Sequence, residues 1–360
     1  MVKGVSFGVL LAPYRVDYYN YLHDKYNFDI YFQLEMFSGQ MFSSYQVENS
    51  STYKPVYLKI KKLPGDRQIA IGLYHILKER NPGIVIVPEF SILTVQVILL
   101  KLFFGFKYKI ISQCDDSINM LNCRRTFSKV HGLSRRLCMP FIDDLILVDR
   151  KAVEWYQERY KRGVWIPIIK DESKLEFYPK EVIKKADSIR ADLKLEGKLT
   201  LLFVARHIAV KNLPILFKAC KNLDRPYHLL VLGDGEERAS WEQIAEEMDV
   251  EVSFVGQQNG VDLQGYYYAS DIFVLPSIIE PFGAVTNEAL LYGCVCVISE
   301  MAGSASLICE GVNGYLFNPF SEDDLAEKIL LSADLLGKTP KSSLMQVKFR
   351  DVMCDLEKIF

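Results

Sequence analysis

The 360-residue sequence lacks the patterns that mark several common kinds of binding site. Its eight cysteines include no Cys-x-x-Cys pair, its five histidines show no ligand spacing, and it contains no Asp-x-Asp pair, so we expect no metal site. The scattered cysteines, several of them in apolar runs, are typical of small core residues in a reducing cytoplasm.

Apolar runs long enough to cross a bilayer are also missing. The most membrane-like segment, residues 91–106, is too short and contains Lys101, so we expect a helix packed on a sheet there. Residues 5–15, VSFGVLLAPYR, lack the charged-then-apolar pattern of a signal peptide, which favours a first buried strand.

What the chain does contain is enough apolar material for two cores. Apolar residues make up 49% of the chain, which excludes disorder, and the length favours two domains. Residues 1–170 hold 24 Lys and Arg against 15 Asp and Glu, a balance of +9, whereas residues 171–360 hold 19 against 30, a balance of −11. The basic first half therefore points to an anionic partner.

Strand-like runs alternate with helix-like runs through both halves. The run 83–89, GIVIVPE, is typical of a strand buried on both faces, and residues 66–81 have a helical pattern. A charged segment near 171–190 separates the halves. The sequence therefore predicts an α/β protein with two doubly wound domains, 1–170 and 171–340, that face a cleft. In such sheets ligands bind beyond the carboxyl ends of the strands.

Two cations follow a strand-like run in the second half. Arg206 comes directly after LTLLFVA, and Lys211 lies five residues further, just before a helix start. Two cations beside a helix N-terminus could form a diphosphate cradle, or they could be solvated surface charges. Gly233 and Gly235 follow the next strand-like run, but Arg238 stands where a dinucleotide fingerprint needs its third glycine, so these glycines indicate only a tight turn.

The stretch EPFGAVTNE, residues 280–288, lies between a strand-like and a helix-like run. A helix start needs one carboxylate in its first turn, yet Glu280 precedes the turn and Glu288 lies inside the helix. Gly283 would let the backbone approach a ligand closely. Taken alone, Glu288 could still be a capping residue.

In chain order, ARHIAVKN, LVLGDGEE, VSFVG, the stretch around EPFGAVTNE and GSASLICEGVNGYLF resemble the family 4 glycosyltransferases of the GT-B fold, or glycosyl transferases group 1. The resemblance covers about residues 200–332 closely, and its most specific part is the Glu-x7-Glu element. In the first half it is one of architecture. The resemblance implies two Rossmann-like domains, the first binding the acceptor and the second the nucleotide sugar.

The resemblance also implies a role for each candidate residue. Arg206 and Lys211 would bind the diphosphate of the nucleotide sugar, Glu288 the ribose and Glu280 the transferred sugar. A carboxylate suits both sugars because it accepts two hydrogen bonds from a vicinal diol. The donor-binding set is completed by the backbone amides of Phe282, Gly283 and Ala284.

The implied reaction moves the sugar to a glycan or lipid-linked saccharide in cell-surface polysaccharide synthesis, with retention of anomeric configuration. Cations and amides would stabilise the departing diphosphate without a metal or other cofactor. A donor phosphate oxygen would take the acceptor's proton, so Glu280 is not expected to be a nucleophile. A sugar-nucleotide epimerase on the same scaffold is the alternative, separable by its products. A nicotinamide oxidoreductase would need the complete glycine fingerprint, and a dead binding module would normally have lost one of the four charged residues.

The first half departs from the family pattern. Many members have a Gly-Gly loop where this chain has LAPYRVDYYNYL, and Arg15 or Asp17 could stand near the donor phosphate or the acceptor. Many members have His-Asp where this chain has Cys114-Asp115. Asp115 could polarise the acceptor hydroxyl, or it could be a turn residue at a strand end.

Residues 123–140, CRRTFSKVHGLSRRLCMP, contain five Lys and Arg and no acidic residue. Phe127, Val130, Leu133 and Leu137 are spaced by three and four, so a helix would have an apolar stripe edged by cations. Such a helix could lie on an anionic membrane, as a peripheral protein on the inner face of the cell membrane, or it could pack on the first domain's own sheet. No aromatic stacking platform accompanies the charge, so we expect no nucleic-acid partner.

The last segment, residues 341–360, is helical in pattern from residue 344 onward. The resemblance implies that this helix crosses back and braces the first domain. We therefore treat it as a separate element from the second domain.

Overall fold

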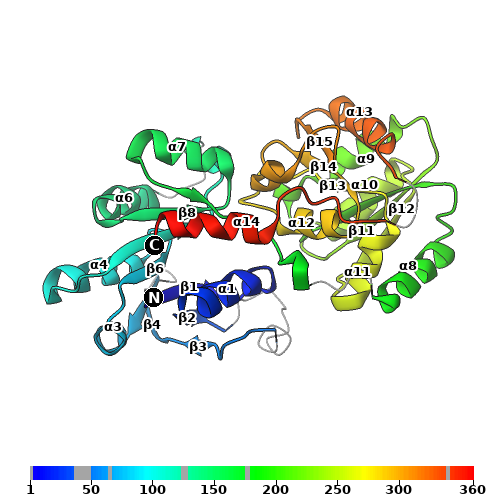
Figure 1. Ribbon diagram of the computed structural model, residues 1–360. Helices are drawn as coiled ribbons and strands as arrows, with labels where there is room; N and C mark the ends of the chain where they lie inside the picture. Colours follow the sequence, from blue (N-terminus) through cyan, green and yellow to red (C-terminus); the bar gives the residue numbers. More distant parts are fainter. Residues whose placement is uncertain (1–2, 36–49, 64–66, 123–128, 175–178, 338–340) are drawn as a thin grey trace. The chain divides into compact units, whose positions relative to one another are not determined.

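The computed structural model divides the chain into two units, each with its own sheet (Figure 1). The first unit is formed by Met1–Lys170 and Phe349–Phe360, and the second by Asp171–Lys348. Both main sheets consist of parallel strands, so the predicted α/β class with two doubly wound sheets is confirmed. The residues that the structure describes are 3–35, 50–63, 67–122, 129–174, 179–337 and 341–360.

The first unit has a seven-stranded sheet in the order β3-β2-β1-β6-β7-β8-β9. The chain runs outward from β1 to β2 and β3 and then returns to β6 on the other side of β1. This reversal is a topological switch point, so the carboxyl ends of β1 and β6 open onto the usual ligand position. The strands are β1 (Gly4–Leu10), β2 (Phe28–Leu34), β3 (Val56–Tyr57), β6 (Ile84–Pro88), β7 (Lys109–Cys114), β8 (Asp144–Leu147) and β9 (Val164–Trp165).

Helices connect these strands and begin and end at recognisable caps. In α4, Ser91 accepts a hydrogen bond from the amide of Thr94 at the start, and Gly105 ends the helix in the left-handed conformation. The helices of this unit are α1 (Val16–Tyr26), α3 (Leu73–Arg80), α4 (Ile92–Phe104), α5 (Ile118–Asn122), α6 (Lys129–Cys138), α7 (Arg150–Tyr160) and α14 (Phe349–Met353).

The helix predicted over residues 66–81 is wrong in its first part. Arg67–Ile71 form strand β5, which pairs antiparallel with β4 (Lys59–Leu63), and α3 begins only at Leu73. The side-chain amide of Gln96 in α4 donates to the carbonyl of Ala70 and accepts from its amide, at 2.9 and 3.1 Å. These contacts hold the backbone extended, so tertiary structure overrides the local pattern.

The second unit has a six-stranded sheet in the order β12-β11-β10-β13-β14-β15, with its switch point between β10 and β13. Its strands are β10 (Leu199–Val204), β11 (Tyr227–Leu232), β12 (Val252–Gly256), β13 (Ile272–Leu275), β14 (Val295–Ser299) and β15 (Gly314–Phe317). Its helices are α8 (Lys180–Asp192), α9 (Leu213–Lys221), α10 (Arg238–Glu247), α11 (Gly260–Ala269), α12 (Ala284–Leu291) and α13 (Glu322–Ala333).

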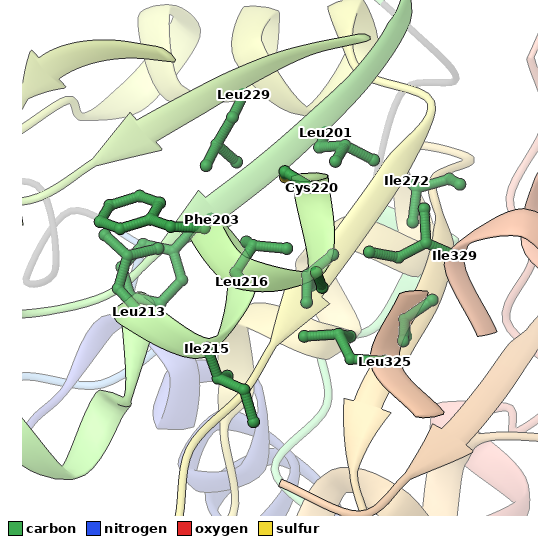
Figure 2. Packing of buried hydrophobic residues seen from close by; sticks show 14 of the residues in the cluster. Leu201, Phe203, Leu213, Ile215, Leu216, Cys220, Leu229, Ile272, Leu325 and Ile329 are labelled. Atoms are coloured by element: carbon green, nitrogen blue, oxygen red, sulfur yellow. The ribbon is translucent and has the colours of Figure 1, made fainter. Parts of the chain in front are cut away.

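One core of the second unit lies between the sheet and helices α9 and α13. Figure 2 shows Leu213 and Leu216 of α9 against Phe203 and Leu201 of β10, while Ile329 of α13 lies near Ile272. All six side chains of this contact are buried completely or nearly so. This packing fixes β10 and β13, whose carboxyl ends carry the candidate residues.

The C-terminal helix is shorter than its sequence pattern predicts. Helix α14 starts at Phe349, and the preceding residues follow the second unit in an extended path. The amide of Leu344 donates to the carbonyl of Leu290, and Asn313 Nδ2 donates to the carbonyl of Leu344, at 2.8 and 3.3 Å. The first bond ties residue 344 to the second unit, and the second occupies the Leu344 carbonyl, which would accept the first hydrogen bond of a helix starting there.

Within the described part of the chain, no helix has the length and apolarity to cross a membrane. Seven cysteines fall in that part, all as free thiols. Five of them are buried, as the sequence predicted, whereas Cys309 and Cys354 are exposed, so the prediction of a core position is wrong for these two.

Candidate functional site

The predicted donor-binding residues lie at the carboxyl edge of the second unit's sheet. Arg206 and Lys211 follow β10, and residues 280–288 follow β13, which is the neighbouring strand. A backbone hydrogen bond of 2.9 Å from Ile278 to Val210 ties the two connections together. Two stretches that are about 70 residues apart in the sequence therefore meet at the switch point, where ligands bind in such sheets.

Lys211 and Glu280 are in direct contact. The Lys211 ammonium donates to Glu280 Oε2, and the two side chains are only 14% and 10% exposed. Ser277 Oγ lies 3.4 Å from the same carboxylate oxygen. A bound diphosphate would give Lys211 a second anionic partner, while Glu280 keeps lone pairs for the hydroxyls of a sugar.

The turn between Glu280 and α12 brings backbone amides to the site. Gly283 is the N-terminal cap of α12 with φ of +92°, a conformation that favours glycine. A Cβ at this position would lie 2.8 Å from Leu275 Cδ2 and 3.1 Å from Ser304 Oγ. The amides of Phe282, Gly283 and Ala284 come at the helix start, where N–H groups have no intrahelical acceptor. The ring of Phe282 is buried, so only its backbone can meet a ligand.

A buried tyrosine fixes the carboxylate of Glu288 through a hydrogen bond. The Tyr267 hydroxyl donates to Glu288 Oε2 at 3.2 Å. Burial raises the pKa of Tyr267 and the charge of Glu288 raises it further, so this hydroxyl remains a donor. The bond orients a half-buried carboxylate, and the sequence analysis did not identify Tyr267.

Arg206 lies on the exposed connection after β10. Its backbone carbonyl accepts a hydrogen bond from the amide of Ile208 at 2.9 Å, which turns the chain sharply before Lys211. Arg206 is exposed to solvent, whereas the Lys211 side chain is largely covered by its surroundings. The structure brings Lys211 and Glu280 into contact and places Arg206 and Glu288 on the same sheet edge.

The first unit has its own ion pair at the carboxyl edge of its sheet. Arg15, in the short helix Pro13–Arg15 after β1, donates through its guanidinium to Asp115 Oδ1 after β7. Arg15 is buried, while the Asp115 side chain is 41% exposed. Asp116, next in the chain, is buried and accepts a 2.8 Å hydrogen bond from the Tyr156 hydroxyl. Asp17 lies in the first turn of α1.

Glu89 is a candidate that sequence reasoning missed. It follows β6 with φ of +48°, and its carbonyl accepts hydrogen bonds from Thr94 Oγ1 and Ser112 Oγ, at 3.0 and 2.7 Å. Burial, together with the charges of Asp115 and Asp116, raises the pKa of Glu89 to about 7, against the opposing effect of Arg15 and Arg135. The sequence feature that could have identified Glu89 is its position as an ionisable residue directly after a buried strand run.

The basic stretch 123–140 lies only partly within the described structure. Residues 123–128, with Arg124, Arg125 and Phe127, fall outside it, as do the side chains of 129–131. Leu133 and Leu137 of α6 are exposed, so packing of the whole stripe on the first unit's own sheet is wrong for these two residues. Cys138 and Met139 are buried there instead.

The residues described include no group of three or more His, Cys, Asp or Glu side chains placed to hold a metal ion.

Comparison with known proteins gives a family match within the second unit. The family described as "Glycosyl transferases group 1" matches residues 185–334. An uncharacterized glycosyltransferase of Haemophilus influenzae is 28% identical over 59% of this chain and 56% of its own length. A Campylobacter jejuni alpha-1,4-N-acetyl-D-galactosaminyltransferase, whose name gives a saccharide on PP-undecaprenol, is 28% identical over 56% of this chain and 54% of its own length. The chain thus spans little more than half of these two relatives.

The fold of the whole chain is similar to that of solved structures. Anabaena HepE in complex with UDP has a TM-score of 0.73 and 16% identity, covering 99% of this chain and 95% of that one. The same protein is also known in complex with UDP-glucose. The predicted GT-B fold is therefore confirmed.

Proposed function

The chain belongs to the glycosyl transferases group 1 family, and we propose that it transfers a sugar from a nucleotide-diphosphate sugar to a glycan or lipid-linked saccharide. The observation that carries the proposal is the largely buried Lys211–Glu280 pair beside the first turn of α12. It puts a cation, a carboxylate and backbone amides at one sheet edge, which is the set of groups that a sugar diphosphate needs.

Each residue has a role that follows from its surroundings. Lys211 and exposed Arg206 bind the diphosphate and stabilise the negative charge that grows on it as it leaves. Glu280 binds hydroxyls of the transferred sugar rather than attacking it, because one of its oxygens is held by Lys211 and Ser277. Glu288, oriented by Tyr267, binds the ribose. The amides of Phe282, Gly283 and Ala284 complete the donor site at the positive end of the α12 dipole.

The first unit supplies the acceptor side of the proposal. Asp115, fixed by Arg15, can accept a hydrogen bond from an acceptor hydroxyl. A Glu89 carboxyl that is half protonated near neutral pH can donate or accept a proton at the same sheet edge. A lipid-linked saccharide in cell-surface polysaccharide synthesis is the acceptor class that the name of the Campylobacter jejuni relative suggests.

The first experiment measures donor binding by calorimetry. HepE binds UDP and UDP-glucose, so UDP and UDP-sugars come first, with ADP and GDP as comparisons. We expect UDP or another nucleoside diphosphate to bind the wild-type chain and to bind the double variant Lys211→Met/Glu280→Gln at least about tenfold more weakly. Glu310→Gln, which alters an exposed carboxylate away from this edge, is the control. Absence of binding by every nucleotide tested would refute the donor site.

The second experiment separates a transferase from a sugar-nucleotide epimerase. A transferase releases the nucleoside diphosphate and adds the mass of one sugar to the acceptor, with retained anomeric configuration. An epimerase returns a nucleotide sugar of unchanged mass. Mass measurement of both products, with and without a chelator, also tests whether transfer proceeds without a metal.

A further inference from the structure

Helix α4 is apolar on two faces, and among the residues that the structure describes only one of these faces is packed against the first unit. Its sequence, ILTVQVILLKLFF, contains one glutamine and one lysine. Leu93, Val97 and Ile98 are buried against the unit. A helix that is apolar all round is normally covered on all sides.

The other face of α4 is exposed. Val95, Leu99, Leu102 and Phe103 recur at intervals of four, three and one, so they share one side of the helix, and Phe103 is 78% exposed. Phe104, also exposed, follows them at the helix end and contacts Tyr74. This unpartnered surface explains why residues 91–106 look membrane-like in the sequence although they form a helix beside a sheet.

Helix α6 extends the apolar surface. It lies next to α4 in the first unit (Figure 1), where Ser134 Oγ donates to the carbonyl of Phe90 at 2.6 Å. This bond turns Leu133 and Leu137 outward, and Leu137 is 62% exposed. Phe141, directly after α6, is exposed as well. We call this combined surface of α4, α6 and Phe141 the α4–α6 face.

The charges around the α4–α6 face are of one sign. Asp115 and Asp116 are the only acidic residues between positions 90 and 142; Asp115 pairs with Arg15, and Asp116 is buried. Asp143, just beyond, lies 3.5 Å from Lys101 and is compensated by it. Among the side chains that the structure describes, this segment contains five cations: Lys101, Lys107, Lys109, Arg135 and Arg136. The neighbouring hairpin adds exposed Lys59, Lys61 and Lys62 on β4.

We propose that the α4–α6 face docks on an anionic lipid bilayer. Apolar side chains that project beyond a helix surface insert among lipid tails, while the surrounding cations meet anionic headgroups. A second copy of this chain fits less well, because the same cations would face each other across the contact. The proposal goes beyond donor binding and does not depend on it.

The test is sedimentation of the full chain with phosphatidylcholine vesicles containing increasing phosphatidylglycerol, at about 50 mM and about 500 mM salt. We expect the bound fraction to rise with phosphatidylglycerol and to fall with salt. The double variant Leu102→Ser/Phe103→Ser should bind at least about tenfold more weakly, since it removes the most exposed apolar groups without touching the buried face. Lys107→Glu/Arg136→Glu should remove the dependence on phosphatidylglycerol.

The matched control is Phe320→Ser, which changes an equally exposed aromatic side chain, 67% exposed, in the second unit and should leave vesicle binding unchanged. Circular dichroism and UDP calorimetry show whether each variant is folded. Wild-type protein that stays in the supernatant at every composition would overturn the proposal. So would undiminished binding of Leu102→Ser/Phe103→Ser, or a wild-type dimer that this variant converts to a monomer without any vesicle binding.

Discussion

Both units carry a cation–carboxylate pair at the carboxyl edge of their sheets, but the pairs are built differently. In the second unit, Lys211 and Glu280 follow the adjacent strands β10 and β13, and their side chains are only 14% and 10% exposed. In the first unit, Arg15 follows β1 and Asp115 follows β7, with Glu89 after the intervening strand β6. The second unit thus holds a compensated pair that an anionic ligand can share, whereas the first adds a carboxyl group that titrates near neutral pH.

The largest expected difference between the units comes from removing each cation. Lys211→Met leaves Glu280 buried without its partner and should lower the free energy of unfolding by about 3–5 kcal/mol. Arg15→Met leaves Asp115 partly in water and should cost only about 1–2 kcal/mol. Denaturant unfolding measures both. Lys211→Met/Glu280→Gln should recover most of the first loss, and equal losses for the two single variants would contradict the comparison.

Substitution of Gly283, in the connection after β13, should give the next largest loss of stability. The connection after β7 in the first unit contains no glycine. The close approach of the backbone to neighbouring side chains at Gly283 therefore has no counterpart there. Gly283→Ala adds a Cβ 2.8 Å from Leu275 in a left-handed conformation and should destabilise the protein by about 2–4 kcal/mol. Gly260→Ala, also left-handed but with no atom within 4 Å, should cost about 1 kcal/mol. Similar melting temperatures for the two variants would show that the close approach is unimportant.

Glu89 should make the first unit less stable as the pH rises. Its pKa is raised from 4.5 to about 7 in the folded protein, so the stability present below pH 4.5 is lost as the pH rises toward 7. Glu89→Gln should remove this slope. The readout is amide hydrogen exchange of β6 and β7 between pH 4.5 and 7.5, and Glu79→Gln on the surface of α3 is the control. An unchanged slope in Glu89→Gln would mean that another group titrates.

His207 should produce the opposite and smallest pH effect, in the second unit. The side chain is fully buried and packs on Trp241 with ring centroids 5.1 Å apart. Burial lowers the pKa of His207 below 6.5, so the second unit should lose stability as the pH falls below that value. His207→Leu should remove the pH dependence of hydrogen-exchange protection in β10 and β11 between pH 5 and 6.5. His75→Leu in the first unit is the control. A slope that survives in His207→Leu would exclude this histidine as its cause.

The second unit could be predicted further from the sequence than the first. Its candidate site residues stand in two short stretches of the sequence. Each stretch follows a buried strand, and the carboxyl ends of parallel strands lie at the same sheet edge. The contact between Lys211 and Glu280 could not be predicted in this way, because it depends on the order β10-β13 and on the bond from Ile278 to Val210. The role of Tyr267 could not be predicted either, because in the sequence a tyrosine in an apolar helix is indistinguishable from a core residue.

In both units, errors arose where tertiary contacts decide local structure. Gln96 draws residues 67–71 into a strand, and Asn313 and Leu290 hold Leu344 out of a helix. The sequence alone predicts Glu89 only as the last residue of a strand-like run. Its importance depends on Asp115 and Arg15, which topology brings near it from distant positions.

The last twelve residues, Phe349–Phe360, have a consequence for how the protein is made. Phe360 stacks on Phe28 with ring centroids 5.2 Å apart, and Phe349 meets Tyr21 edge-on, so these residues complete the core of the first unit. A ribosome reaches them only after synthesising the whole second unit, which takes on the order of ten seconds or more at about 5–20 residues per second. During that time the nascent first unit has its aromatic surface around Phe28 uncovered. The second unit is complete before Phe349–Phe360 are synthesised, so it can finish folding before the first unit does, although it is encoded later.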